Sequence, residues 1–197
     1  MLVLPPNAEG IAEAARRIRV GGVVAYPTET VYGLGVDPRN EEALAALFRA
    51  KGRPDTNPVL VIVGSECQLE GIVDDLSPAA RECIQHFWPG PLSLLLPAAP
   101  GLPDSIAPSG GKVCVRCPGH EVARRLCDAA GFAITSTSAN QSGEPPATTA
   151  SMCMELRIDA VLDGGTLDSQ IPSTVYDPDE RRVLREGAVA TSALLGF

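Results

Sequence analysis

The sequence is poor in aromatic residues, in histidine and in long apolar runs. Phe, Trp and Tyr make up 4% of its 197 residues, so the core must be mainly aliphatic. Only two histidines occur, His86 and His120, which argues against a catalytic triad built on histidine. The longest apolar runs, such as 59–63 and 92–96, have the length of strands and not of membrane spans. We therefore expect no association with a membrane.

Basic residues are too few for a broad nucleic-acid-binding surface. Lys and Arg number 16 against 24 Asp and Glu, a formal net charge of −8, which still leaves room for a small cationic pocket. The first ten residues have no basic segment followed by a long apolar one, so no secretory signal is expected. The six cysteines lack the spacing of a disulfide framework, and reduced thiols in a cytoplasmic protein are the simpler interpretation.

The common nucleotide and metal motifs are incomplete. Gly33-Leu34-Gly35 lacks the third glycine of a dinucleotide fingerprint, and Gly111-Lys112 lacks the upstream glycine and downstream Ser or Thr of a P-loop. Cys114 and Cys117 have Cys-x-x-Cys spacing, but no second such pair exists and residues three apart on a strand face opposite sides. A nucleotide site in this chain must therefore have another design.

Helical and strand-like segments alternate along most of the chain. The 19 glycines and 18 prolines indicate many irregular loops, and the Pro/Gly/Ser-rich loop 97–111 is a candidate lid. The alternation favours an α/β fold with a mixed sheet in a single domain over residues 1–197. We predict helices at 8–20, 41–50, 78–87 and 120–130, with one more after 149. We predict strands at 23–26, 59–63, 92–96, 113–116, 133–136, 160–163, 174–177 and 182–185.

Polar clusters follow several of these strands and one helix. Residues 28–33 place two hydroxyls, a carboxylate and a phenol after a buried strand, and residues 136–140 place hydroxyls and an amide after another. Lys51 and Arg53 flank a glycine, so both can point at one anion. Taken alone, each cluster also fits a capped turn or the cations that favour a helix C-terminus.

A further hydroxyl pair and two arginines complete the set of candidates. Ser173-Thr174 and Arg185 could close an anion pocket, and Arg116 ends an apolar strand. A lone arginine at a strand end also fits a surface ion pair, and the spacing alone does not decide between the two.

In this order, the clusters resemble the YrdC/TsaC family of threonylcarbamoyl-AMP synthases. The combination of Lys-x-Arg with Ser-x-Asn at this separation is specific, whereas either alone is weak. The matching stretches, which span nearly the whole chain, are YPTETVYGLG (26–35), KGRPDTNP (51–58), FWPGPLSLLLP (87–97), VRCPGH (115–120), STSANQSGEP (136–145), PSTV (172–175) and LREG (184–187).

The resemblance implies a YrdC-like twisted mixed sheet with flanking helices and a concave cationic groove. It implies a nucleotidyltransferase reaction of L-threonine, bicarbonate or CO2 and ATP to threonylcarbamoyl-AMP and diphosphate. Mg²⁺ would be bound through the phosphates. The product would serve N6-threonylcarbamoyladenosine formation at position 37 of tRNAs that read ANN codons, through a separate threonylcarbamoyl-transfer complex.

The resemblance also assigns residues by motif position. Lys51 and Arg53 would neutralise the triphosphate. Ile62 stands where some members carry a histidine, so one threonine contact is expected to be missing or replaced. The implied threonine site is Thr30, Arg116, Ser136 and Ser173. The implied ATP site is Lys51, Arg53, Asn57, Lys112, Ser138, Asn140, Pro146 and Arg185.

Two other functions fit the same residues. A double-stranded RNA or tRNA-binding module could use a cationic groove, although the acidic net charge weighs against it. The second is a YrdC-like paralogue that acts on another carbamoyl substrate, as the YrdC-like domain of hydrogenase maturation proteins does. The acylphosphatase and zinc-finger segments that accompany that domain are missing from this sequence, which argues against that type.

Overall fold

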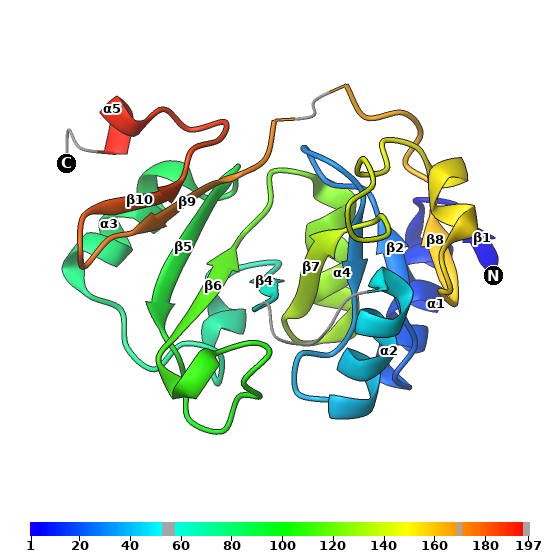
Figure 1. The fold of residues 1–197 in the computed structure, drawn as a ribbon, viewed down its shortest axis with the longest axis horizontal. Helices are drawn as coiled ribbons and strands as arrows, with labels where there is room; N and C mark the ends of the chain where they lie inside the picture. Colours follow the sequence, from blue (N-terminus) through cyan, green and yellow to red (C-terminus); the bar gives the residue numbers. More distant parts are fainter. Residues whose placement is uncertain (53–57, 169–170, 195–197) are drawn as a thin grey trace.

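The computed structural model describes residues 1–52, 58–168 and 171–194, and Figure 1 shows their arrangement. The strands are β1 (Leu2–Leu4), β2 (Val24–Tyr26), β3 (Gly33–Gly35), β4 (Leu60–Ile62), β5 (Leu92–Pro97), β6 (Lys112–Arg116), β7 (Ile134–Ser138), β8 (Ala160–Leu162), β9 (Thr174–Asp177) and β10 (Arg182–Arg185). The α-helices are α1 (Ala8–Arg19), α2 (Glu41–Lys51), α3 (Pro78–Phe87), α4 (Glu121–Ala130) and α5 (Thr191–Leu194). Short 3-10 helices cover Glu66–Leu69, Pro108–Gly110 and Ala150–Glu155.

The strands form one mixed sheet, which confirms the predicted α/β class. Their order is β1-β8-β2-β3-β7-β4-β6-β5-β9-β10. The central strand β4 runs parallel to β6 and antiparallel to β7. The segment after 149 is a 3-10 helix where we predicted a helix, and β1 and β3 were not predicted.

Local capping explains why the helix boundaries were predictable. The Asn7 side chain accepts a hydrogen bond from the Gly10 N–H at 3.0 Å, and Ser77 accepts one from the Ala80 N–H at 3.1 Å. Gly131 ends α4 in the left-handed conformation. Helix α2 runs one residue further than predicted, so Lys51 is its last residue.

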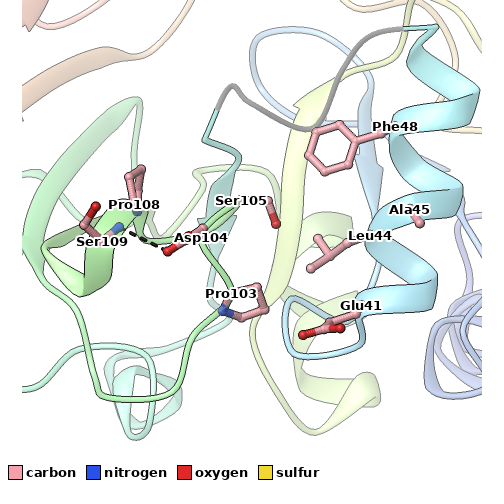
Figure 2. A pocket seen from close by; sticks show the side chains of 9 residues that line it. All are labelled: Glu41, Leu44, Ala45, Phe48, Pro103, Asp104, Ser105, Pro108 and Ser109. Atoms are coloured by element: carbon pink, nitrogen blue, oxygen red, sulfur yellow. Dashed lines mark hydrogen bonds between the residues drawn. The ribbon is translucent and has the colours of Figure 1, made fainter.

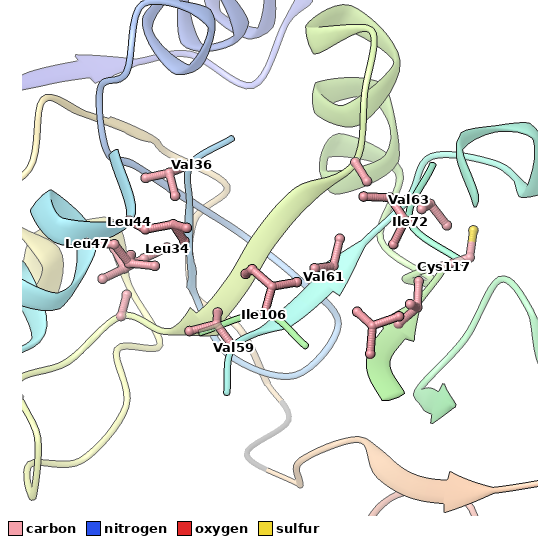
Figure 3. Packing of buried hydrophobic residues seen from close by; sticks show 14 of the residues in the cluster. Leu34, Val36, Leu44, Leu47, Val59, Val61, Val63, Ile72, Ile106 and Cys117 are labelled. Carbon is pink, nitrogen blue, oxygen red and sulfur yellow. The ribbon is translucent and has the colours of Figure 1, made fainter. Parts of the chain in front are cut away.

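Two aliphatic clusters lie on opposite faces of the sheet. Helices α1 and α4 contribute to one cluster, which also contains Tyr26 and Ile62. Helices α2 and α3 contribute to the other, part of which is seen in Figure 3. Val61 and Ile62 belong to different clusters because successive strand residues point to opposite faces. The sheet is thus buried on both sides around the middle strands.

Strand β3 is built from glycines because a buried tyrosine fills the space beside it. A Cβ atom on Gly35 would lie 2.8 Å from Tyr26 Cε1, and one on Gly33 would lie 3.1 Å from Tyr26 Cζ. Tyr26 is fully buried and donates its hydroxyl hydrogen to the carbonyl of Thr135 at 2.9 Å. This packing holds the β2–β3 hairpin, and with it the polar loop 27–32, in place.

Candidate functional site

A cavity of about 320 Å³ lies where six segments of the chain meet. It is lined by cationic and hydroxyl side chains together with small apolar ones, and no acidic residue belongs to the described lining. The segments are the β2–β3 loop, the start of β4, the ends of β6, β7 and β10, and the residue before β9. The lining residues are Thr30, Val31, Pro58, Val59, Leu60, Arg116, Ser136, Thr137, Ser138, Ser173 and Arg185.

Lys51, Ser138 and Asn140 form a hydrogen-bonded group at one side of this cavity. Lys51 is only 3% exposed. Its Nζ donates to the Ser138 carbonyl at 2.6 Å and to Asn140 Oδ1 at 2.7 Å. Ser138 Oγ also donates to Asn140 Oδ1, at 2.6 Å. The end of α2 and the end of β7 are therefore joined through a buried ammonium group.

The same asparagine fixes the following loop. Asn140 Nδ2 donates to the carbonyls of Gln141 and Glu144 at 2.9 and 2.6 Å. Every polar atom of the Asn140 side chain is thus engaged. The loop that contains the predicted contact Pro146 is held in a set position relative to Lys51.

Arg116 also lines the cavity and is buried with few partners. Its side chain is 4% exposed and its Nη1 lies 3.6 Å from Glu29 Oε1, an ion pair too long for a hydrogen bond. Arg116 Nε has no hydrogen-bond partner among the described residues. A buried guanidinium with unused donors costs free energy until an acceptor arrives. Arg116 is therefore ready to bind an anion in the cavity.

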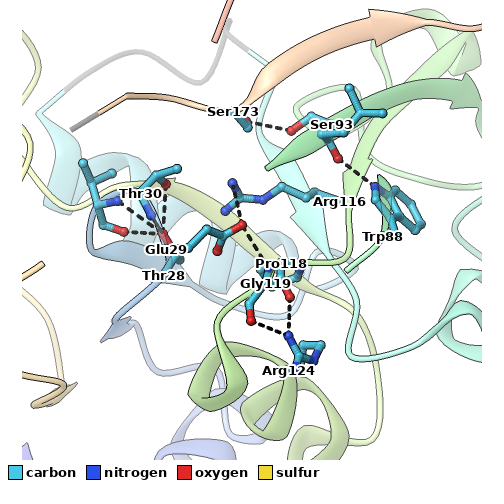
Figure 4. A network of polar contacts seen from close by, with 12 residues as sticks. Thr28, Glu29, Thr30, Trp88, Ser93, Arg116, Pro118, Gly119, Arg124 and Ser173 are labelled. Atoms are coloured by element: carbon cyan, nitrogen blue, oxygen red, sulfur yellow. Dashed lines mark hydrogen bonds and ion pairs between the residues drawn. The ribbon is translucent and has the colours of Figure 1, made fainter. Parts of the chain in front are cut away.

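Glu29 connects Arg116 to the turn that follows β6 (Figure 4). Its Oε1 accepts a hydrogen bond from the Gly119 N–H at 3.0 Å. Arg124 supports the turn from α4 by donating to the carbonyls of Pro118 and Gly119 at 2.7 and 2.6 Å. Glu29 belongs to a predicted polar cluster without a predicted role of its own, and the structure places it beside Arg116.

The loop that carries Thr30 is shaped by Thr28. Thr28 Oγ1 donates to the Val31 carbonyl at 2.6 Å and accepts from the Thr30 N–H at 3.1 Å. This side-chain turn replaces backbone hydrogen bonds that the loop lacks. It presents Thr30 to the cavity.

Ser173 and Arg185 close the cavity from the β9–β10 side. Arg185 Nη2 donates to the Ser173 carbonyl at 2.9 Å and to Ser173 Oγ at 3.1 Å. Gly187 allows this approach, since a Cβ atom there would lie 2.3 Å from the Pro172 carbonyl oxygen. Partial burial lowers the pKa of the Arg185 guanidinium, and the nearby charge of Arg116 acts in the same direction. Arginine remains charged despite such a shift, so two cations face one cavity.

The structure brings most of the predicted site residues together. Lys51 and Asn140 adjoin the cavity through their hydrogen bonds with Ser138. Arg53 and Asn57 lie outside the described residues. The functional role of each residue stays a prediction. The predicted residues that line the cavity directly are Thr30, Arg116, Ser136, Ser138, Ser173 and Arg185.

Lys112 and Pro146 are not among the residues that line the cavity. Lys112 begins β6, at the other end of the strand from Arg116. Its Nζ lies 2.5 Å from Oδ2 of the buried Asp177. Ile62 is fully buried in the cluster with α1 and α4, so its side chain makes no part of the cavity wall.

A second cavity lies between α2 and the loop that follows β5 (Figure 2). Its volume is about 700 Å³, and Leu44 and Phe48 on α2 face Pro103 and Pro108 across it. Glu41 and Asp104 give it an acidic character. None of the predicted site residues lines this cavity. The loop itself is tied to β4, because the Ser105 carbonyl accepts a hydrogen bond from the Val59 N–H at 2.8 Å.

The described ranges contain no group of three or more His, Cys, Asp or Glu side chains that could hold a metal ion. Cys114 and Cys117 are both free thiols. Burial raises the pKa of Cys114 to about 12 and that of Cys117 to about 11. Within the same ranges, no helix is long and apolar enough to cross a membrane.

Cationic and hydroxyl side chains converge on one cavity of an α/β protein with a mixed sheet, an arrangement that suits an anionic ligand. Comparison with known proteins gives the family. The Sua5/YciO/YrdC family model, described as telomere recombination, matches residues 16–187. The chain belongs to this family, which confirms the resemblance seen in the motifs.

Individual relatives are similar over most of the chain. A threonylcarbamoyl-AMP synthase from Thiobacillus denitrificans is 41% identical over 171 residues, covering 85% of this chain and 90% of that protein. One from Pyrococcus abyssi is also 41% identical, over 170 residues, but the chain spans only 50% of its length. The crystal structure of P. abyssi Sua5 complexed with L-threonine superimposes with a TM-score of 0.93 at 36% identity, covering 100% of this chain and 60% of that one.

Proposed function

We propose that this protein is an L-threonylcarbamoyladenylate synthase. It joins L-threonine, bicarbonate and ATP into threonylcarbamoyl-AMP, releasing diphosphate and water. The observation that carries this proposal is one cavity lined by Arg116, Ser138, Ser173 and Arg185, with Lys51 and Asn140 hydrogen-bonded to Ser138 beside it. The family membership and the named relatives support it.

Threonine occupies the end of the cavity formed by Arg116. The buried guanidinium takes the substrate carboxylate, since its Nε has no hydrogen-bond partner among the described residues. Thr30, Ser136 and Ser173 surround it with hydroxyls. These short side chains lose little conformational freedom on binding a small ligand.

ATP occupies the end formed by Ser138 and the buried Lys51 group. Lys51 supplies a point charge and Arg185 a planar guanidinium for the phosphates. Arg53, Asn57, Lys112 and Pro146 join this site by motif position, and for Lys112 this requires that it leave its ion pair with Asp177.

Alignment and charge neutralisation accelerate the reaction. Threonine's amine adds to bicarbonate with loss of water, and an oxygen of the resulting carbamate attacks the α-phosphorus as diphosphate leaves. Holding the two reactants in line lowers the entropic part of the barrier. Lys51, Arg53 and Arg185 stabilise negative charge that develops on the phosphoryl group. A narrow cavity also protects the carbamate from water.

Mg²⁺ fits this chain poorly as a protein-bound cofactor. The described residues supply no set of acidic ligands, and the cavity lining is cationic. Mg²⁺ therefore enters on the phosphates of ATP, and we assign no catalytic step to a metal held by the protein.

The product is a mixed anhydride that a further enzyme must consume. A threonylcarbamoyl-transfer complex in the cytoplasm passes the group to adenosine 37 of tRNAs reading ANN codons. The single YrdC-like domain at residues 1–197 makes the intermediate and needs no membrane.

The test is diphosphate release from ATP and bicarbonate with each of several amino acids supplied in turn. We expect release that depends on L-threonine. Release with another carbamoyl donor only would favour a paralogue with a changed substrate. No release, together with tRNA binding that weakens steeply with salt, would favour an RNA-binding module.

A further inference from the structure

A buried serine outside the cavity lining is hydrogen-bonded to the hydroxyl of Ser173. Ser93 lies on β5 and is fully buried. Its Oγ is 2.8 Å from Ser173 Oγ, a contact drawn in Figure 4. Ser173 Oγ also receives a hydrogen bond from Arg185 Nη2 at 3.1 Å. Three residues from three strands or strand ends thus form one hydrogen-bonded chain.

Counting hydrogens fixes the direction of this chain. A serine hydroxyl has one hydrogen to donate and two lone pairs that accept. Among the described residues, Ser173 Oγ is the only recorded hydrogen-bond partner of the Ser93 side chain. If Ser173 donated to Ser93, the buried hydrogen of Ser93 would have no acceptor, at a cost of about 1–3 kcal/mol. Ser93 therefore donates, and Ser173 accepts.

The consequence falls on the exposed side of Ser173. One of its lone pairs receives the Ser93 hydrogen, and the other receives a hydrogen from Arg185. Only the hydroxyl hydrogen of Ser173 is then left to make a further hydrogen bond, and it is directed away from both partners. Since Ser173 lines the cavity, that hydrogen is available to a ligand there.

We propose that Ser93 is a positioning residue that makes Ser173 a hydrogen-bond donor to the ligand and not an acceptor. The group to which Ser173 donates is an anionic oxygen, that of the carboxylate of the amino-acid substrate. This assignment rests on the proposed function. Arg116 lines the same cavity, so its charge favours the same negatively charged oxygen. An amide or ammonium hydrogen at this point would find no free lone pair on Ser173.

The alternative is that Ser93 only fills space in an otherwise leucine-rich strand. Under that alternative, Ser93→Ala would leave ligand selection unchanged, because alanine fits the same volume. The effect of losing the Ser93 hydroxyl can be separated from a general weakening of ligand binding by comparing two ligands that differ only at the carboxylate.

The experiment measures the dissociation constants of L-threonine and L-threoninamide for the full chain and its variants. The unaltered chain should prefer the carboxylate. In Ser93→Ala, Ser173 regains a free lone pair and can accept an amide hydrogen. The preference should then fall about 3- to 10-fold, the worth of one hydrogen bond. Ser93→Thr keeps the hydroxyl and should retain the preference.

A second variant keeps the test independent of Ser93 packing. Ser173→Ala should reduce the same preference, and adding Ser93→Ala to it should change nothing further. An unchanged preference in Ser93→Ala, or equal weakening of both ligands, would overturn the inference while leaving the proposed function intact. Failure of the unaltered chain to bind L-threonine would instead contradict the proposed function, and this inference with it.

Discussion

Lys51 donates a hydrogen bond from Nζ to Oδ1 of Asn140 at 2.7 Å, although 89 residues separate them in the sequence. The bond joins the last residue of α2 to the loop after β7 and stands beside Ser138, which lines the cavity. This nearly buried ammonium shapes the loop, and under the proposed function it supplies positive charge to a phosphate.

Removal of the Lys51 ammonium should slow the reaction strongly. We expect Lys51→Ala to reduce threonine-dependent diphosphate release at least tenfold, because a charge-assisted contact is worth about 1.5–3 kcal/mol. Arg49→Ala removes an exposed charge from the same helix and should leave the rate within about twofold. Similar rates in both variants would remove Lys51 from the proposed site.

Arg116 should affect threonine more than ATP. Arg116→Ala removes the buried guanidinium that awaits an acceptor and should raise the KM for threonine at least tenfold. The KM for ATP should change much less. Arg125→Ala on α4, where the side chain is 44% exposed, serves as the control. Equal effects on both substrates would show that Arg116 does not act at the amino-acid end.

Lys112 should contribute to stability through its ion pair. Lys112→Ala leaves the buried carboxylate of Asp177 without its cation, and we expect the free energy of unfolding to fall by about 1–3 kcal/mol. Arg182→Ala disrupts an exposed pair with Glu180 and should cost less than about 1 kcal/mol. Urea denaturation measures both, and equal losses would contradict the burial argument. A raised KM for ATP in Lys112→Ala would support its predicted nucleotide contact.

The thiols should differ sharply in reactivity. Cys67 is exposed, whereas burial raises the pKa of Cys114 to about 12 and that of Cys117 to about 11. Because only the thiolate reacts, iodoacetamide at pH 8 should label Cys67 first, as seen by mass spectrometry. Cys67→Ser is the control. Rapid labelling of Cys114 or Cys117 in the folded chain would reopen a redox role for the pair.

The same shifts predict an alkaline limit to stability. A thiol whose pKa is raised by folding stabilises the native state fully below its unfolded pKa of about 8.5. That contribution is lost as the pH rises from there through about 11 and 12. The free energy of unfolding should therefore fall between pH 9 and 11, and a smaller fall is expected in Cys114→Ala.

Local signals explain why the helices and most strands were predictable. The side chains of Asn7 and Ser77 cap helices by accepting a hydrogen bond from the backbone N–H three residues later, and Gly131 ends α4 in the left-handed conformation. Strand β3 escaped prediction because glycine carries no strand signal. Its glycines are required by the ring of Tyr26, which reaches them across the hairpin.

The site was predictable as a set of motifs but not as a geometry. The sequence resemblance supplied Thr30, Arg116 and Ser173, which the fold brings to one cavity. Partners that act through another residue were missed. The side chain of Ser93 contacts that of Ser173, although 80 residues separate them in the sequence. The only sequence signal for Ser93 was one hydroxyl inside an apolar strand. Such pairings depend on sheet order, which short motifs do not contain.

Incorporation of labelled bicarbonate into an adenylate shows whether this chain forms threonylcarbamoyl-AMP. The full chain is incubated with ¹³C-bicarbonate, ATP and L-threonine, and the nucleotide products are analysed by mass spectrometry. We expect threonylcarbamoyl-AMP that carries the label, formed only when all three substrates are present and nearly lost in Lys51→Ala. Formation of unlabelled adenylate, or of no adenylate by the unaltered chain, would contradict the proposed function.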